Sequence, residues 1–286
     1  MLDWFRPKRT DVPRIKGFEM QKRIFRGAFS NIYLATMKRK KETVALKVLT
    51  EAGSRIASLL RRHPSTLWEG ELLSVLDHPN IIKCIGYSKD PPYWVAMDYV
   101  ESKLTSFVGR CANAEEESDI LLLLAQLASA MSYLHTRGLV HRDICMSNIL
   151  VDHDGLLKLI DFGLTVPIDS SVTRGRAGTP SYMAPEMIRK WTHTEVTDIY
   201  SFGVVMYELL TGTKPFRGHL REQRMTRSLN VNPPMPSTIG RFCSPDVEEV
   251  LAKCLSKEPE HRFNNSHELD SALFVLLHSR KLTESE

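Results

Sequence analysis

The chain lacks a long uninterrupted apolar segment. Its longest uncharged run, residues 120–134, is broken by Gln126, Ser129 and Ser132, whereas a membrane-spanning helix needs about 20 predominantly apolar residues. The run therefore predicts a buried helix. Residues 1–10 carry charges with no apolar stretch behind them, and Leu2 excludes N-myristoylation. We expect no membrane span and a cytoplasmic location.

Paired cysteines are also missing. The five cysteines are scattered along the chain and none forms a C-x-x-C pair: Cys84, Cys111, Cys145, Cys243 and Cys254. This excludes a disulfide framework and a zinc ribbon, and it favours a reducing compartment. With 42% hydrophobic and 25% charged residues the composition is that of an ordinary globular protein. A net charge of +4 is too small to predict a nucleic-acid partner.

The residue pattern changes character near position 100. Before it, β-type runs rich in Val, Ile and aromatics predict strands at 18–25, 31–37, 43–49, 82–88 and 93–98, with one helix at 67–76. After it, helical spacing predicts helices at 118–137, 196–211, 245–256 and 267–279. We expect an N-terminal extension (1–17), a β-rich lobe (18–100), an α-rich lobe (101–280) and a tail (281–286).

One cluster of polar residues carries a definite chemistry. His141-Arg142-Asp143 is followed by Asn148 and then by Asp161-Phe162-Gly163. Such an H-R-D-x-x-x-x-N loop with a following D-F-G marks a phosphoryl-transfer site. Phosphoryl transfer needs a carboxylate to receive the acceptor hydroxyl, here Asp143, and oxygen ligands for magnesium, here Asn148 and Asp161.

From about residue 18 to about residue 277 the chain resembles a eukaryotic-type protein kinase domain. The resemblance implies an α+β, bilobal protein kinase fold, with a small β-rich N-lobe holding one main helix and a larger α-helical C-lobe. It implies ATP and Mg²⁺ as cofactors and a protein substrate as partner. The run Tyr200-Ser201-Phe202-Gly203 leans toward the tyrosine-kinase-like branch of serine/threonine kinases.

The resemblance assigns Lys47, in Val44-Ala45-Leu46-Lys47, to the α- and β-phosphates of ATP. Its partner in the family is a helix glutamate. Counting back from His78-Pro79-Asn80, Glu69 holds that position and Glu71 is its competitor. Glu69 and Glu71 are two positions apart, and side chains at that spacing on a helix point to different faces. We expect Glu69 to be the partner.

The glycine-rich loop departs from the family pattern G-x-G-x-x-G. Only the middle glycine, Gly27, is kept, with Phe25 in the first position and Ser30 in the third. Phe25 puts nucleotide affinity in question, because the pattern lets backbone N–H groups approach the phosphates. The other residues that the resemblance places around the adenine are Ile32, Ala45, Met97, Asp98, Val100 and Leu150.

The stretch from Gly178 to Glu186 resembles the P+1 loop and A-P-E that close a kinase activation segment. Glu186 is expected to pair with Arg262, and Asp198 is expected to anchor the catalytic loop. In the family, the arginine before the catalytic Asp binds a phosphate on the activation segment. Arg142 is that arginine here, and upstream or self-phosphorylation would fall on Ser170, Ser171 or Thr173.

Cys145 is the main departure. Serine/threonine kinases usually have a lysine there, which contacts the γ-phosphate and the P+1 threonine; tyrosine kinases lack it but carry a different P+1 loop. The Gly178-Thr179-Pro180 run is of the serine/threonine kind. We therefore expect phosphorylation of serine and threonine in proteins. A pseudokinase-type scaffold, supported by Phe25 and Cys145, and a dual-specificity kinase, supported by Cys145, remain the alternatives.

Overall fold

In a computed structural model the residues described are 12–60, 68–168, 178–190, 193–216, 218 and 221–283. They form two compact units. The first takes the described residues up to Leu76 together with Lys83–Val100. The second takes Asp77–Ile82 and the described residues from Glu101 onward. Residues 77–82, which the sequence pattern left with the β-rich lobe, thus belong with the helical unit.

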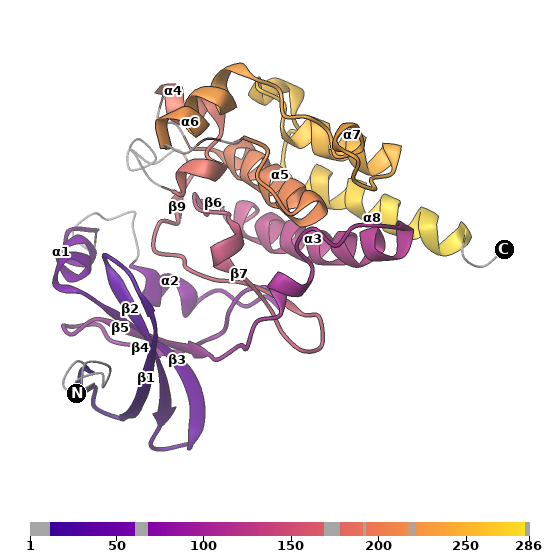
Figure 1. The fold of residues 1–286 in the computed structure, drawn as a ribbon. Coiled ribbons are helices and arrows are strands. Elements are labelled where there is room, and N and C mark those ends of the chain that lie inside the picture. Colours follow the sequence, from indigo (N-terminus) through magenta and orange to yellow (C-terminus); the bar gives the residue numbers. More distant parts are fainter. Residues whose placement is uncertain are drawn as a thin grey trace, which may run out of the picture. The chain divides into compact units, whose positions relative to one another are not determined.

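The first unit is built on one antiparallel sheet in the order β1-β2-β3-β5-β4 (Figure 1). Its strands are β1 (Phe18–Arg26), β2 (Ser30–Met37), β3 (Glu42–Leu49), β4 (Cys84–Tyr87) and β5 (Trp94–Asp98). All five lie within the expected ranges or differ from them by one or two residues at an end. Strongly β-forming runs bounded by turns explain this agreement.

The two faces of this sheet have different roles. One face carries Tyr33, Leu46 and Val48, which join Ile15 and Phe18 in a buried apolar cluster. Side chains alternate between the faces of a strand. The residues between those of the cluster, among them Lys47 on β3, therefore project from the opposite face.

Two short helices follow β3. The first, α1 (Glu51–Leu60), was not expected from the sequence, and the expected helix over 67–76 is only the five residues of α2 (Glu69–Leu73). Trp68, 2% exposed, fixes the start of α2, since its ring packs on Tyr87 and Tyr93 at centroid distances of 5.9 and 5.6 Å. A Cβ on Gly70 would lie 2.5 Å from the Trp68 ring, so only glycine allows this close packing.

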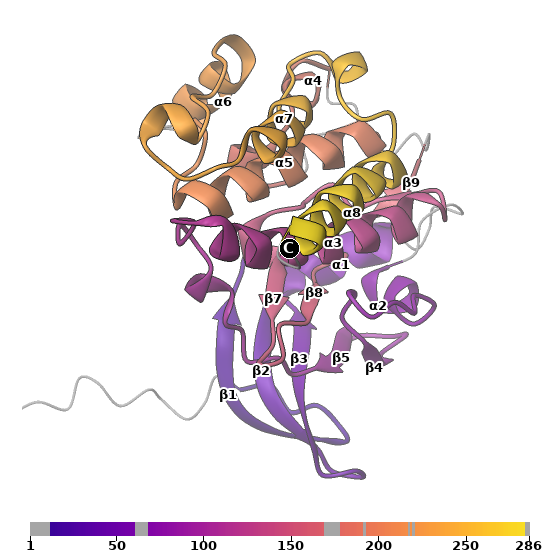
Figure 2. The same cartoon turned by 90° about the vertical axis from the view of Figure 1, so that its right-hand side faces the viewer.

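The second unit is helical. Its α-helices are α3 (Ala114–His135), α4 (Pro185–Lys190), α5 (Glu195–Thr211), α6 (Arg221–Asn230), α7 (Pro245–Cys254) and α8 (Ser266–Thr283). Figures 1 and 2 both show α8 lying alongside α3. Helices α4 and α6 were not expected from the sequence. Among the described residues, no helix is long and apolar enough to cross a membrane.

Helix α3 is fixed at both of its ends. Near its N-terminus the fully buried Glu117 accepts hydrogen bonds from the backbone N–H of Ser244 (2.9 Å) and from Arg280 on α8 (2.6 Å). At its C-terminus His135 Nε2 lies 3.0 Å from Asp198 Oδ2 on α5. These contacts hold α3 against α5, α7 and α8, and Asp198 in turn contacts the catalytic loop.

Candidate active site

Lys47 and Glu69 form a buried ion pair in the first unit. Lys47 Nζ lies 2.8 Å from Glu69 Oε1 and 2.7 Å from Oε2, and the two side chains are 6% and 5% exposed. Lys47 comes from β3 and Glu69 from the first position of α2, where Trp68 holds the helix. Glu71, the competitor in the sequence, is only half-buried. The structure thus brings together the lysine and the glutamate that the spacing singled out.

The expected adenine-side residues of the first unit share the Lys47 face of the sheet. Strand register places Ile32 opposite both Phe25 and Lys47, and Ala45 opposite Met97. Directly opposed residues of antiparallel strands lie on the same face. Met97 is buried, whereas Phe25, next to the last residue of β1, is 55% exposed. Asp98 and Val100 follow at the end of β5 and are half-buried.

The tip of the glycine-containing loop is tied to the start of α1. Gly27 N donates to Ser30 O at 2.8 Å, closing the hairpin between β1 and β2. Thr50 donates its backbone N–H to Phe29 O and its hydroxyl to Ala28 O, each at 2.9 Å. A Cβ on Gly53 would overlap the carbonyl oxygen of Phe29. The sequence did not single out Thr50 or Gly53.

Phe25 lies close to the one glycine that the loop keeps. A Cβ on Gly27 would be 3.0 Å from ring atom Cε1 of Phe25 and 3.0 Å from the carbonyl oxygen of Ser30. The absence of a side chain at Gly27 therefore allows the Phe25 ring to rest against the loop backbone. Ser30, in the third position of the pattern, is buried.

In the second unit, Asp198 anchors the catalytic loop as expected. Its carboxylate accepts the backbone N–H of His141 at 2.8 Å and of Arg142 at 3.0 Å. Arg142 has φ 70°, a left-handed conformation that non-glycine residues seldom adopt. Burial tends to raise the pKa of Asp198, but hydrogen bonding and charge from His135 outweigh it, so the pKa is lowered. The carboxylate therefore stays ionised and holds a strained backbone.

Asp143 is held by two donors from different segments. Its Oδ1 accepts the backbone N–H of Thr179 at 2.7 Å, and its Oδ2 accepts Nδ2 of Asn148 at 2.9 Å. The same Asn148 nitrogen lies 2.9 Å from the carbonyl oxygen of Asp143. The carboxylate expected to receive the acceptor hydroxyl is thereby fixed between the catalytic loop and the P+1 loop.

A small hairpin positions the two expected metal ligands. Strands β7 (Ile149–Val151) and β8 (Leu157–Leu159) pair with Ile149 opposite Leu159. Asn148 precedes β7, Asp161 follows β8, and the N–H of Ile160 donates to Asn148 O at 2.9 Å. Asn148 and Asp161 therefore lie at the same end of the hairpin. Leu150, the remaining adenine-side candidate, is half-buried within β7.

The chemistry of these donors fits magnesium. Asn148 donates both of its hydrogen bonds to Asp143 through Nδ2, so its amide oxygen points away from Asp143. Asp161 supplies a carboxylate whose Oδ1 accepts the backbone N–H of Gly163 at 3.3 Å. Carboxylate and amide oxygens are the ligands a hard cation prefers. Asp161 has φ 63°, a second left-handed residue in this small region. Backbone strain of this kind concentrates at functional sites.

Cys145 keeps part of the contact that a lysine would make at its position. Its Sγ lies 3.7 Å from Thr179 Oγ1 and 3.2 Å from Ser147 Oγ, and the residue is fully buried. Burial, followed by the charge of Asp143, raises the pKa of the Cys145 thiol to about 11. The thiol is therefore protonated near neutral pH and contacts the P+1 threonine without supplying a charge.

The P+1 loop packs tightly on the catalytic loop. Gly178 has φ 101°, and a Cβ there would lie 2.5 Å from the carbonyl oxygen of Arg142. The expected pairing of Glu186 with Arg262 is confirmed, with two bonds of 2.6 and 2.8 Å. Arg142 itself is 6% exposed. The expected phosphorylation positions Ser170, Ser171 and Thr173 lie outside the described residues.

This combination of fold and site is that of one protein family. The family model "Protein kinase domain" matches residues 18–274. The chain belongs to the protein kinase family, which confirms the predicted family and the α+β bilobal fold.

Three relatives of this chain are protein kinases. Serine/threonine-protein kinase PrkC of Bacillus subtilis is 29% identical over 276 residues, which cover 95% of this chain and 42% of PrkC. Aurora kinase of Schizosaccharomyces pombe is 34% identical over 255 residues, covering 86% of this chain and 68% of the relative. Aurora kinase A-B of Xenopus laevis is 33% identical over 253 residues, covering 87% and 59%. These relatives support the predicted class, a protein serine/threonine kinase. The chain spans only about half the length of PrkC and of Aurora kinase A-B.

Proposed function

We propose that this chain transfers the γ-phosphoryl group of ATP to serine and threonine hydroxyls of protein substrates. The observation that carries the proposal is the position of Asp143, held by Asn148 on one side and by the backbone of Thr179 on the other. A base fixed against the P+1 loop is where an acceptor hydroxyl, aligned by that loop, would deliver its proton.

Each polar residue of the candidate site takes one role in this proposal. Lys47, oriented by Glu69, binds the α- and β-phosphates, and Asn148 and Asp161 hold magnesium, which neutralises phosphate charge when bound. Asp143 receives the proton of the acceptor hydroxyl and orients its oxygen. Such a site acts by positioning and by electrostatics, because phosphoryl transfer asks little covalent chemistry of the protein.

Nucleotide binding would use the Lys47 face of the first unit. Ile32, Ala45 and Met97 would supply apolar surface there, and the backbones of Asp98 and Val100 would supply the groups that pair with adenine. Phe25, Gly27 and Ser30 would form the loop over the phosphates.

A positional peptide library with Mg-ATP, followed by phosphoamino-acid analysis, tests the proposal. We expect phosphoserine and phosphothreonine to dominate, because Thr179 and Pro180 hold a substrate backbone near enough for a short hydroxyl to reach Asp143. A mainly phosphotyrosine product would show that the acceptor is tyrosine rather than serine or threonine, and the assignment of phosphoryl transfer would still hold. Loss of all product in a folded sample that still binds a partner would favour the scaffold alternative.

One observation favours that scaffold alternative. The Phe25 ring lies against Gly27, at the loop whose backbone N–H groups would have to approach phosphates. ATP binding measured by calorimetry on wild type and on Phe25→Gly separates the cases. A functional kinase should bind Mg-ATP without the substitution, whereas a scaffold with an obstructed loop should bind it only after the substitution.

Regulation by phosphorylation at Ser170, Ser171 or Thr173 stays part of the proposal. A phosphate adds about −1.5 to −2 charge and can order a loop through an arginine, and Arg142 is the arginine in question. Phosphatase treatment, with removal verified by mass spectrometry, should lower activity. Unchanged activity after verified removal would contradict this regulation and leave the catalytic proposal intact.

A further inference from the structure

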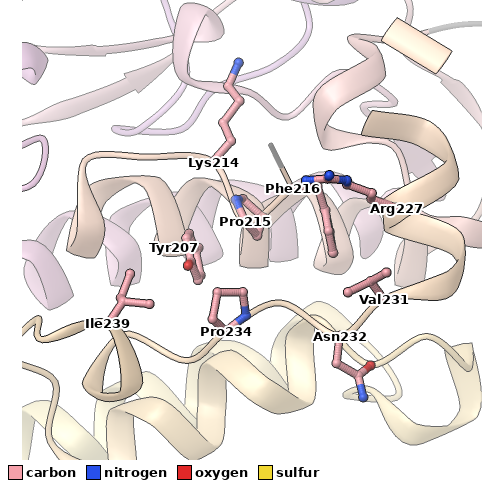
Figure 3. Close-up of a pocket in the computed structure, with 9 residues that line it drawn as sticks. All are labelled: Tyr207, Lys214, Pro215, Phe216, Arg227, Val231, Asn232, Pro234 and Ile239. Atoms are coloured by element: carbon pink, nitrogen blue, oxygen red, sulfur yellow. The ribbon is translucent and has the colours of Figure 1, made fainter. Parts of the chain in front are cut away.

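A pocket of about 510 Å³ lies in the second unit, outside the residues assigned to phosphoryl transfer. Figure 3 shows Tyr207 from α5, Pro215 and Phe216 from the connection between α5 and α6, and Pro234 and Ile239 from beyond α6. Tyr207 and Phe216 are buried and form its base. The rim is apolar and accessible, since Val231 is 51% exposed and Ile239 40% exposed.

The charged residues that line this α5–α6 pocket are basic. Among the described residues its lining includes Lys214 and Arg227 but no carboxylate. Behind the base, Lys257 Nζ lies 4.2 Å from the Phe216 ring centroid and donates to Ser228 O at 2.7 Å. Burial, followed by the charges of Arg262 and Arg189, lowers the pKa of Lys257 to about 8, as expected in a region of positive potential. An apolar ligand that carries negative charge fits this lining.

The pocket continues toward the P+1 loop. A second pocket of about 500 Å³ shares Lys214 and Phe216 with it and reaches Ser181. Its lining also includes Glu208, whose carboxylate accepts a hydrogen bond from the Tyr182 hydroxyl. Lys214 extends away from the other lining residues in Figure 3, and its Nζ lies 4.8 Å from the ring centroid of Tyr182. Ser181 and Tyr182 directly follow Thr179 and Pro180, the loop that aligns the acceptor in the proposed function. A polypeptide lying on that loop could therefore follow this path into the α5–α6 pocket.

We propose that the α5–α6 pocket docks an acidic, apolar segment of the protein substrate, separated in sequence from the phosphorylated serine or threonine. One or two apolar side chains occupy the space between Tyr207, Pro234 and Ile239, and flanking glutamates or aspartates face Arg227 and Lys214. The inference rests on the proposed kinase function, since it names the substrate feature that this function would select.

Binding can be measured without catalysis. The probe is a fluorescent peptide, Glu-Glu-Leu-Phe-Glu-Glu, and its anisotropy is followed with the full chain in the absence of ATP. We expect Ile239→Ser and Arg227→Glu each to weaken binding about tenfold, a change of about 1.4 kcal/mol. The peptide Lys-Lys-Leu-Phe-Lys-Lys should not bind. Phe274→Ser, at a 59% exposed residue of α8, is the matched control and should bind like wild type.

Kinetics then connect docking to the acceptor. The best acceptor peptide from the library is joined to the docking sequence by Gly-Ser linkers of increasing length. We expect the KM of the joined peptide to fall about tenfold at the optimal linker, through raised effective concentration, with kcat unchanged. Ile239→Ser should abolish this gain and leave the KM of the acceptor peptide alone unchanged.

The outcomes separate the two proposals. Phosphorylation of the acceptor peptide alone reports the kinase function, whatever the docking result. No binding of the acidic peptide to wild type, binding by Ile239→Ser and Arg227→Glu as tight as by wild type, or a KM unaffected by the joined sequence would each overturn the docking proposal. Sedimentation equilibrium tests a different occupant: a wild-type dimer that becomes a monomer in Ile239→Ser would assign the pocket to a second copy of the chain and overturn it too.

Discussion

Thr179 donates its backbone N–H to Oδ1 of Asp143 at 2.7 Å, while its hydroxyl lies 3.7 Å from the sulfur of Cys145. One residue of the P+1 loop thus contacts both the candidate base and the position where relatives of this type usually have a lysine. The close approach of Gly178 to the Arg142 carbonyl brings Thr179 into this position. The P+1 loop, which would align the acceptor, is therefore hydrogen-bonded directly to the candidate base Asp143.

Asp143→Asn and Asp161→Asn should each lower kcat by about 10²–10⁴-fold, because each removes a group that acts in the transition state. Circular dichroism and the unfolding midpoint should stay near wild type, since neither side chain is part of the apolar core. Asp154→Asn, at an exposed acid in the turn between β7 and β8, is the control. Near-normal turnover by folded Asp143→Asn would contradict the assignment.

Lys47→Met should lower stability as well as activity. It leaves the buried Glu69 carboxylate without its lysine, and breaking a buried pair in this way costs about 3–5 kcal/mol. The double variant Lys47→Met/Glu69→Gln removes both charges and should recover most of that loss while remaining inactive. Urea unfolding of the two proteins measures the difference. Equal stability of the single and double variants would show that the pair does not contribute as inferred.

Cys145 should resist alkylation in the folded protein. The thiol is buried and its pKa is raised to about 11, so the reactive thiolate is scarce at neutral pH. Iodoacetamide followed by peptide mass spectrometry should label Cys145 only after urea is added. Cys145→Lys should raise kcat on serine peptides, since a cation at this position stabilises phosphate charge. Cys145→Met, which adds length without charge, should not; rapid labelling of the native protein would refute the buried-thiol description.

Gly53→Ala should loosen the phosphate loop. A methyl group there overlaps the carbonyl oxygen of Phe29, so the contact between α1 and the loop tip must open. We expect a higher KM for ATP with little change in overall stability. Gly86→Ala, in strand β4 of the same unit, is the matched control, because its added Cβ would meet nothing nearer than Trp94 at 3.9 Å. The same KM for ATP in Gly53→Ala and Gly86→Ala would contradict the inferred contact between α1 and the tip of the loop.

The contribution of Lys257 to stability should increase with pH between about 8 and 10.5. Its pKa is lowered from 10.5 to about 8 in the folded protein, so between these values the unfolded chain binds the proton more strongly. Unfolding free energy rises with pH wherever the unfolded state holds more protons. Urea midpoints of wild type and Lys257→Met are measured at pH 8 and pH 10, and the midpoint of wild type minus that of the variant should be larger at pH 10. The same change of urea midpoint with pH in wild type and in Lys257→Met would contradict the lowered pKa of Lys257.

The polar cluster was readable from the sequence because its chemistry fixes both residue type and spacing. Asn148 and Asp161 must bracket a short hairpin, and Glu69 must lie a set distance before His78-Pro79-Asn80. The five main strands were readable too, since Val- and Ile-rich runs between turns have few other structures open to them.

Long-range backbone contacts were not readable. Gly53 occurs within a helical stretch, where glycine is ordinarily a cost, and nothing nearby signals that a carbonyl from the loop tip approaches it. Helix α2 is shorter than its apolar spacing suggests because the tertiary packing of Trp68 on Tyr87 and Tyr93 decides where it starts. The α5–α6 pocket is likewise assembled from segments that no local pattern relates.

Glu117 and His135 stand at opposite ends of α3, a helix of 22 residues and therefore about 33 Å long. Glu117 depends on Arg280, close to the end of the last helix, and His135 contacts the Asp198 that fixes the catalytic loop. Arg280 follows every candidate phosphoryl-transfer residue in the sequence, so during synthesis those residues emerge before the side chain that binds Glu117 at the N-terminal end of α3. Until Arg280 has emerged and docked, a nascent chain that already carries these residues holds the N-terminal end of α3 without the ion pair between Glu117 and Arg280.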